Sequence, residues 1–256
     1  MKEKLLRPVK PNPGIRSWYR RQIEKLIDAL RRSLMWWLVA RYKTRSATQI
    51  QKELDSLRFY WLGMFDDSAK RIAKRYVQQV NRAVSSSMKS ALTDVGFNIT
   101  WKDDRNVQNV LRSLRDTQVS LIKSIPQEEL NRVSGILNRG LQNGQDLAAI
   151  KKEMENSFGI SKRRARVIAI DQTNKATFAI NRARGIQVGV KEAIWIHIAG
   201  RYTSRPTHVA MHHKRFFLEG KDAGMYDDDV GHRVMPGELV NCMCHCRMIV
   251  PPLGQK

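Results

Sequence analysis

Apolar residues recur three and four positions apart along most of the first 190 residues, and this spacing restricts the chain to a mainly helical fold. In the first such series, basic residues take the remaining positions of the helical wheel, as on a helix with one buried face. Its apolar members are Ile23, Leu26, Ile27, Leu30, Leu34 and Leu38. The same pattern predicts further helices over 47–92, 107–124, from 126 to about 140, 146–158 and 161–184.

Glycine and proline set the predicted ends of these helices. Pro126 is expected to stop one helix and to begin the next, because proline lacks the backbone N–H that a helix interior needs. Gly159 is expected to end the helix that Asp146 caps, and Ser161 to cap the helix that follows. A further break is predicted near Gly63.

The segment from 193 to 252 differs from the rest, because it holds the cysteines and the histidines together with many turn-forming residues. Alternating apolar residues predict short strands at 193–198, 216–218 and 248–250. We expect these strands to form a small sheet that packs against the 161–184 helix. The predicted fold class is mainly α, with an elongated helical N-terminal body and a small α+β, loop-rich C-terminal module.

Composition divides the chain into three parts. Prolines and lysines in residues 1–14 predict a basic flexible arm. Residues 15–120 form a helical region, and 121–256 form a domain whose helices extend to about 190 and whose small sheet and Cys/His-rich end cover 193–252. The most apolar run, 34–40, is far shorter than the roughly 20 residues that cross a bilayer, so no membrane span is expected.

The chain is strongly basic, with Lys+Arg 46 against Asp+Glu 24 and a formal net charge of +22. This excess indicates a polyanionic partner, for which nucleic acid, an anionic membrane surface and an acidic protein are the candidates. The candidate DNA contacts are Arg71, Lys74, Arg75, Lys162, Arg163, Arg164 and Arg166. Without a base-reading motif, DNA would be bound through its phosphates and without sequence preference. The alternative for each basic cluster is a solvated helix face.

Three cysteines, Cys242, Cys244 and Cys246, lie too near one another for a disulfide framework and indicate a reducing compartment. With His208 or His212 as third and fourth ligands, the first two offer the ligand types of a tetrahedral zinc site. Cysteines one residue apart chelate a metal only if the backbone curls between them. The alternative is that both are small buried apolar residues, and that His208 makes a buried hydrogen bond that locks the loop after Pro206.

Two catalytic hypotheses use the same segment. Cys242 with His208 would form a nucleophilic pair for acyl transfer, although the sequence shows no evident orienting acid or oxyanion hole. A metal nuclease centre would draw its ligands from the acidic run and the histidine after it. These residues are Asp227, Asp228, Asp229 and His232. The alternative for the acidic run is a solvated loop.

Two motifs in the C-terminal segment resemble those of a known family. They are Ser204-Arg205-Pro206-Thr207-His208 and Pro236-Gly237-Glu238-Leu239-Val240-Asn241-Cys242-Met243-Cys244, and they follow Ile168-Ala169-Ile170-Asp171-Gln172-Thr173, Gly185-Ile186 and Trp195. Over about 120–252 the chain is similar to the Mu-F-like phage head morphogenesis family, the minor head proteins of tailed bacteriophages. The residues that match the family pattern are Arg205, His208, Asn241, Cys242 and Cys244.

The resemblance implies a minor component of the virion rather than an enzyme. Such a protein would associate with the portal protein inside the head, near the capsid interior or a scaffold protein, and would contact packaged double-stranded DNA. Residues 15–120 would dock on the portal or the capsid interior. The protein would assemble in the host cytoplasm and aid head assembly or DNA delivery. The alternative is a metal-dependent enzyme, a nuclease or peptidase, that uses the C-terminal His/Cys cluster.

Overall fold

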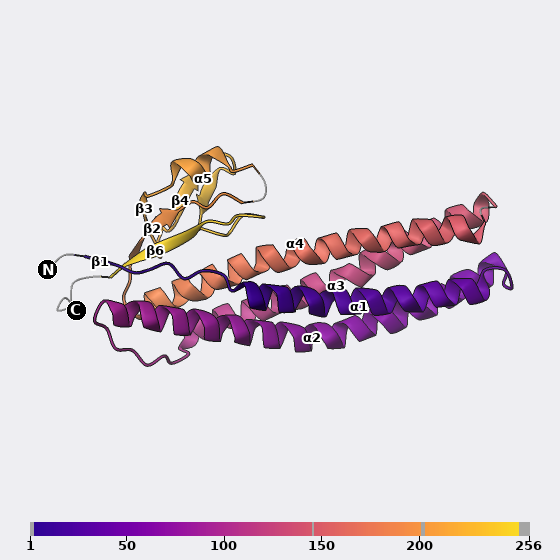
Figure 1. The fold of residues 1–256 in the computed structure, drawn as a ribbon, viewed down its shortest axis with the longest axis horizontal. Helices are drawn as coiled ribbons and strands as arrows, with labels where there is room; N and C mark the ends of the chain where they lie inside the picture. The colour runs from indigo at the N-terminus through magenta and orange to yellow at the C-terminus, as the bar shows by residue number, and fades with distance from the viewer. Residues whose placement is uncertain (1–2, 145, 201–202, 251–256) are drawn as a thin grey trace. The chain divides into compact units, whose positions relative to one another are not determined.

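The computed structural model describes residues 3–144, 146–200 and 203–250. Its helices are α1 (Pro13–Arg41), α2 (Ala47–Asp94), α3 (Arg105–Gln142), α4 (Leu147–Gln187) and the short α5 (Pro206–Ala210) (Figure 1). Its strands are β1 (Lys4–Leu5), β2 (Glu192–Ile196), β3 (Arg215–Phe217), β4 (Met225–Asp227), β5 (His232–Val234) and β6 (His245–Val250). This confirms the mainly α class with a small α+β part. Residues 1–2 of the predicted arm and 251–256 of the predicted C-terminal domain lie outside the described residues.

The predicted helix breaks are wrong at Gly63, Pro126 and Gly159, which lie inside the continuous helices α2, α3 and α4. Pro126 costs α3 one backbone hydrogen bond. Its side chain is nevertheless buried, as are those of Ile125 and Leu130, so the apolar face of the helix continues through it. Tertiary burial of a continuous apolar face outweighs the local preference for a break.

The chain folds into two compact units, and each draws on several segments. The helical unit consists of Ser17–Arg75 and Arg115–Ala169, and the sheet unit consists of Met1–Arg16, Tyr76–Leu114 and Ile170–Lys256. The helices α2, α3 and α4 each contribute to both units. The predicted domain boundary between residues 120 and 121 lies inside α3, which runs from Arg105 to Gln142.

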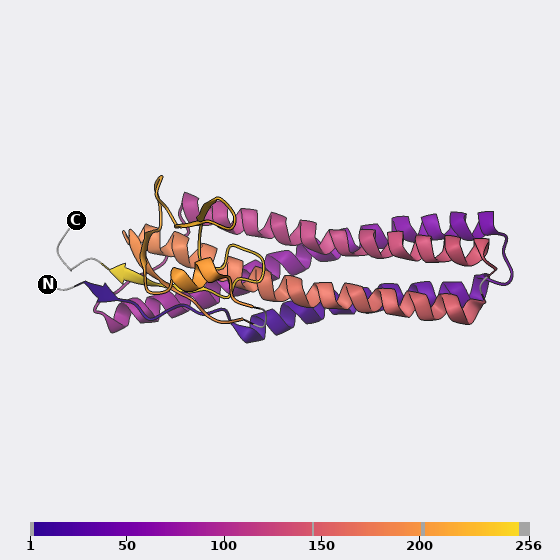
Figure 2. The ribbon, with the colours of Figure 1, turned by 90° about the horizontal axis from the view of Figure 1, so that it is seen from above.

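In the helical unit, segments of α1 to α4 run alongside one another (Figure 2). The six predicted apolar positions of α1 are all buried except Leu26, which is half-buried. The other helices of this unit contribute buried side chains that include Leu54, Phe65, Ile122, Leu130, Leu137, Ile150, Met154 and Phe158. Each such side chain stabilises the fold by roughly 1.5–3 kcal/mol through its removal from water, so the helices form around this core.

A buried carboxylate in the helical unit explains why Ser161 does not cap a helix. Glu129 on α3 is fully buried, and its oxygens accept hydrogen bonds from Ser157 Oγ at 2.7 Å and Ser161 Oγ at 2.6 Å. Arg132 donates to the same carboxylate at 2.7 Å. Both serines lie inside α4, so this helix is fixed to α3 by polar contacts as well as by apolar packing. The three donors satisfy a charge that would otherwise be costly to bury.

The main sheet of the sheet unit has the strand order β1-β6-β2-β3, with neighbouring strands antiparallel. The three predicted strands are confirmed in β2, β3 and β6, whereas β1 and the β4–β5 hairpin were not predicted. Lys4 pairs with Val250 and Leu5 with Ile249, and Leu6 and Val9 are buried. This part of the predicted basic arm therefore belongs to the sheet.

The sheet packs against the C-terminal part of α4, as the sequence predicts. Gly185 of α4 faces β6 so closely that an added Cβ would lie 2.6 Å from Met248 Sδ. Ala193 of β2 is fully buried and pairs with Met248 on one side and Phe216 on the other. A small residue on the helix therefore allows a large one on the strand.

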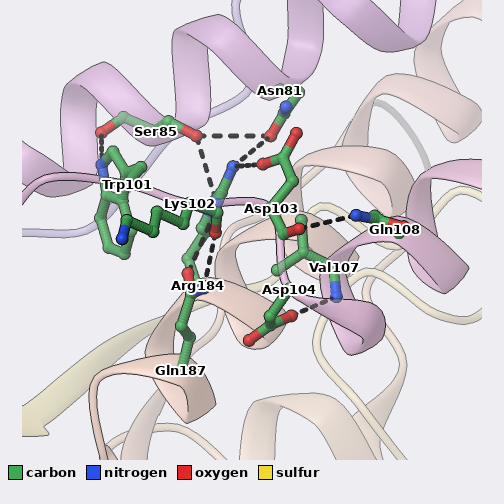
Figure 3. A network of polar contacts seen from close by, with 10 residues as sticks. All are labelled: Asn81, Ser85, Trp101, Lys102, Asp103, Asp104, Val107, Gln108, Arg184 and Gln187. Carbon is green, nitrogen blue, oxygen red and sulfur yellow. Dashed lines mark hydrogen bonds and ion pairs between the residues drawn. The ribbon is translucent and has the colours of Figure 1, made fainter.

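A single arginine joins three segments of the sheet unit (Figure 3). Arg184 of α4 is 2% exposed and pairs with Asp103 in the loop between α2 and α3. It also donates hydrogen bonds to Ser85 Oγ (3.2 Å), Asn81 Oδ1 (3.3 Å), Lys102 O (2.9 Å) and Gln187 Oε1 (3.1 Å). Its guanidinium carbon lies 5.1 Å from the centre of the Trp101 ring. The rigid fork of donors in arginine suits this arrangement, in which one side chain satisfies several acceptors.

Candidate functional site

The short helix α5 places His208 inside the sheet unit. Arg205 precedes the helix in an extended conformation, and Pro206 fits the first turn because its missing N–H has no intrahelical acceptor there. His208 is 2% exposed, and its ring stands edge-on to Trp195 of β2, with ring centres 5.2 Å apart. The imidazole is therefore held by packing, and its two nitrogens face different partners.

The turn before β6 brings two cysteines to the same imidazole. Cys242 Sγ lies 3.4 Å and Cys244 Sγ 3.6 Å from His208 Nδ1. These three ligand atoms all lie within 4.8 Å of one another, and all three residues are buried. Among the residues that the structure describes, these three form the one group of His, Cys, Asp or Glu side chains close enough together to hold a metal ion. The structure therefore brings together three of the residues that the sequence offered as zinc ligands.

Backbone conformation and contacts to α4 shape this turn. Asn241 adopts a left-handed conformation with φ 61°, and its backbone N–H donates to Asp171 Oδ1 at 3.0 Å. Asn174 Nδ2 donates to the carbonyl oxygen of Cys242 at 3.1 Å. Asparagine tolerates the left-handed region better than most residues. The family-typical Asn241 thus helps to turn the chain so that the sulfur atoms of Cys242 and Cys244 point the same way.

Asp227 holds the far side of the imidazole. His208 Nε2 donates to Asp227 Oδ2 at 3.0 Å, and the carboxylate is fully buried. The other carboxylate oxygen accepts the backbone N–H of Asp229 at 3.0 Å. Asp228 and Asp229 are exposed. The structure thus separates the residues of the predicted nuclease centre, because Asp227 faces inward to His208 while its neighbours remain on the surface, and His232 contacts Val230 O instead.

The electrostatics of the cluster favour one thiolate. Hydrogen bonds from Cys244 and His208 lower the pKa of Cys242 to about 4, although burial acts in the opposite direction. Donation of its proton to Cys242, together with burial, raises the pKa of Cys244. Burial acts to lower the pKa of His208, but the hydrogen bond and charge of Cys242 and the charge of Asp227 raise it overall. Burial alone raises the pKa of Cys246 to about 12. Its sulfur is not one of the ligand atoms that lie within 4.8 Å of one another, so this third cysteine lies outside the cluster.

The cluster faces a cavity of about 210 Å³ in the sheet unit. His197, at the end of β2, also lines this cavity, and its Nδ1 lies 3.5 Å from Cys244 Sγ. Arg205 crosses the rim of the cavity and donates to Val240 O at 3.1 Å. All five family-typical residues therefore line one cavity, and His208, Cys242 and Cys244 are among them.

The sequence did not assign Asp227 and His197 to this site. Asp227 lies 19 positions after His208, and its partner becomes apparent only when the β4–β5 hairpin folds back on α5. His197 directly follows β2, next to Ile196, which pairs with His245 of β6. Trp195, which was part of the family pattern, lies two positions before it and packs on His208.

The predicted DNA contacts lie in the helical unit. Arg71, Lys74 and Arg75 of α2 are exposed, and so are Arg163 and Arg166 of α4. Lys162 forms an ion pair with Asp28 at 2.7 Å. Arg164 forms an ion pair with Glu128 and donates to Ser124 Oγ at 2.9 Å. Lys162 and Arg164 are therefore partly neutralised by helical neighbours.

Arg71 and Arg75 line a groove between α1 and α2 in the helical unit, with a volume of about 250 Å³. We call it the basic groove, and its lining residues are Trp18, Gln22, Lys25, Leu26, Ser68, Arg71, Ile72 and Arg75. The guanidinium carbon of Arg75 lies 5.1 Å from the centre of the Trp18 ring. The lining contains cationic side chains and no carboxylate, so it is a local concentration of positive charge.

Comparison with known proteins agrees with the motifs around the cavity. Residues 131–249 match the family described as Phage Mu protein F like protein. The match confirms the resemblance that the sequence predicts. It supports a role in phage head morphogenesis.

A more distant likeness covers most of the chain. An uncharacterized protein of Haemophilus influenzae is 24% identical over 256 aligned positions, which cover 93% of this chain and 54% of the relative. The chain therefore spans about half the length of that relative. No solved structure matches the chain. Every helix in the described residues is too short or too polar to cross a membrane.

Proposed function

We propose that the chain is a minor head protein of a tailed bacteriophage, associated with the portal vertex and in contact with packaged DNA. The match of residues 131–249 to the Mu F-like family supports the assignment to the phage head. The basic groove of the helical unit is the observation that carries the DNA contact, because it gathers Lys25, Arg71 and Arg75 on one surface without an acidic neighbour in its lining. In this position the protein aids head assembly or DNA delivery.

Electrostatics supports binding through phosphates. A formal net charge of +22 attracts a polyanion over long range. Exposed arginine and lysine side chains bind phosphate oxygens and release the counterions that surround DNA, and this requires no contact with base edges. Arg163 and Arg166 on α4 would add further phosphate contacts, whereas Lys162 and Arg164 are held by Asp28 and Glu128. DNA of any sequence would therefore be bound alike.

Exposed aromatic side chains of the helical unit support docking on a protein partner. Trp36 on α1 is 72% exposed, and Phe59 and Tyr60 on α2 are 84% and 55% exposed. Large aromatic residues are enriched where proteins associate and are costly to leave in water. We propose that these residues contact the portal protein, and that the surrounding capsid interior or a scaffold protein is the second neighbour. Assembly would take place in the host cytoplasm, which agrees with three free cysteines.

Replacing Lys25, Arg71 and Arg75, the three cationic side chains of the basic groove, together with alanine should weaken binding to every DNA duplex alike. The wild-type chain is expected to show a steep fall of log K with log salt, and the triple variant should reduce that slope by about 3 if each side chain neutralises one phosphate. Fluorescence anisotropy of unrelated labelled duplexes across a salt series measures both quantities.

The control removes the same charge elsewhere in the helical unit. Lys43, Lys151 and Lys152 are exposed lysines outside the basic groove. Their joint replacement with alanine should leave the salt slope close to that of the wild type. An equal loss of slope in both variants would assign binding to total charge rather than to the groove. Binding that did not depend on salt would contradict the proposal.

A second candidate is a metal-dependent nuclease or peptidase. The observation that favours it is that His208, Cys242 and Cys244 line a cavity, where a bound substrate would reach them. Asp227 supplies the orienting acid that a thiol–imidazole pair requires. Cleavage of DNA or peptide by the purified chain, lost on replacement of His208 or Cys242, would establish this function in place of a purely structural domain.

A further inference from the structure

We infer that His208, Cys242 and Cys244 bind a zinc ion, that Asp227 positions the imidazole, and that the fourth coordination position faces the cavity next to His197. The inference goes beyond the proposed function, because it holds whether or not the chain contacts DNA. It rests on the distances between the ligand atoms, on the path of the backbone between the cysteines, and on the hydrogen bond behind the imidazole.

The distances fit a tetrahedral zinc ion. Zinc bonds of about 2.3 Å to sulfur and about 2.0–2.1 Å to nitrogen place neighbouring sulfur and nitrogen ligands about 3.5 Å apart at the tetrahedral angle. His208 Nδ1 lies 3.4 Å from Cys242 Sγ and 3.6 Å from Cys244 Sγ. Both nitrogen–sulfur distances therefore match edges of such a tetrahedron, and the two sulfur atoms lie within 4.8 Å of each other.

Two cysteines separated by one residue can bind the same metal ion only if the backbone curls between them, and the backbone does so here. Cys242 and Cys244 lie in the turn before β6, outside the regular strand that begins at His245. The left-handed Asn241 reverses the chain directly before the pair. Both sulfurs consequently reach the same nitrogen, while Cys246 enters the strand and pairs with Trp195. The third cysteine is therefore a control for the other two.

Asp227 supplies the outer partner that metal-bound histidines usually have. Its carboxylate accepts the Nε2 proton of His208, so Nδ1 is the ring nitrogen left to bind a metal once zinc displaces the proton that Nδ1 shares with Cys242. Such a carboxylate fixes both the tautomer and the orientation of the ring. Because both side chains are buried, water does not compete for this hydrogen bond.

His197 lies beside Cys244 on the cavity side of the proposed zinc site. Its Nδ1 lies 3.5 Å from Cys244 Sγ, which is the separation of two ligands on one tetrahedral zinc ion. It also lines the same cavity as the other three residues. A water molecule would take the fourth position, because His197 does not belong to the group whose ligand atoms all lie within 4.8 Å of one another.

The test uses the full chain, stripped with a chelator and then titrated with Zn²⁺ alone. One ion per chain is expected, with a higher Tm in the presence of Zn²⁺. Replacing the ion with Co²⁺ should give the visible bands of a tetrahedral site and the near-ultraviolet thiolate-to-cobalt absorption. Cys242→Ser and Cys244→Ser should each lose this thiolate absorption in part and bind Zn²⁺ far more weakly.

Two further variants keep the test decisive if a ligand variant folds poorly. Cys246→Ser should bind Zn²⁺ as the wild type does, because this side chain lies outside the cluster. Asp227→Asn, which keeps the shape of the side chain, should weaken Zn²⁺ binding about 10–100-fold, as loss of an outer-shell partner does. A wild-type chain that bound no Zn²⁺ and kept its Tm with chelator would overturn the inference. Equal loss of Zn²⁺ in Cys246→Ser would also overturn it, and DNA binding would be unaffected by either result.

Discussion

Replacing His208 with alanine should lower the free energy of unfolding of the metal-free chain by about 3–5 kcal/mol, the usual cost of removing one partner of a buried ion pair. Asp227 is fully buried, and its Oδ2 atom is paired with His208. Without the imidazole, a carboxylate charge remains in the interior with only the Asp229 N–H to stabilise it. Loss of packing against Trp195 adds to the cost. Urea denaturation followed by circular dichroism, with chelator present, measures the change.

A double variant tests whether the unpaired carboxylate of Asp227 causes the loss of stability. If it causes most of the cost, His208→Ala and Asp227→Ala combined should destabilise the chain by clearly less than the sum of the single variants. His232→Ala is the control, because His232 is exposed and its ring contacts the carbonyl oxygen of Val230 rather than the carboxylate of Asp227. It should change stability by less than about 0.5 kcal/mol. Strict additivity of the two single variants would contradict the account of the His208–Asp227 pair.

Replacing Arg184 with alanine should destabilise the chain by about 3 kcal/mol, since each of several hydrogen bonds contributes roughly 0.5–1.5 kcal/mol. The side chain is 2% exposed and holds the loop between α2 and α3 against α4. Its ion pair with Asp103 adds little, because that carboxylate is 45% exposed and screened by water. Most of the loss would come from acceptors left without a donor, such as the carbonyl of Lys102. Urea denaturation checks the magnitude.

The shape of the side chain matters more here than its charge. Arg184→Lys keeps the charge but cannot reproduce the fork that reaches Ser85, Asn81 and Lys102 at once. It should therefore retain only a small part of the lost stability. Arg105→Ala, which removes an exposed arginine at the start of α3, should be close to neutral. A lysine variant as stable as the wild type would show that charge alone holds the loop.

The helices could be predicted from the sequence because their signal is local. Ile23 to Leu38 repeat with the period of a helix, and the structure buries that face. The predicted ends failed where tertiary packing decided the outcome. Pro126 and Gly159 weaken a helix locally, but Pro126 is itself buried in the core of the helical unit and α4 is bonded to Glu129 on both sides of Gly159. The sequence around a proline or glycine does not show whether another helix will pack over that position.

The functional site could be predicted only in part, for a similar reason. His208, Cys242 and Cys244 were recognised by residue type and by their resemblance to a family, and the structure brings them together. Asp227 was not assigned to His208, because in the sequence it is one of three consecutive aspartates with nothing to distinguish it. The fold of the β4–β5 hairpin buries it and leaves Asp228 and Asp229 exposed. The hydrogen bond between His208 and Asp227, which lie 19 positions apart in the sequence, depends on the fold and cannot be read from either motif.

The central claim is that the basic groove of this chain lies against DNA inside the phage head. A photo-crosslinking amino acid placed at Arg71, with a matched one at Lys151 outside the groove, tests it in purified heads. The account predicts that the probe at position 71 crosslinks to DNA in filled heads, and that the probe at position 151 does so far less. Crosslinking at 151 that equals that at 71, or absence of the chain from filled heads, would contradict it.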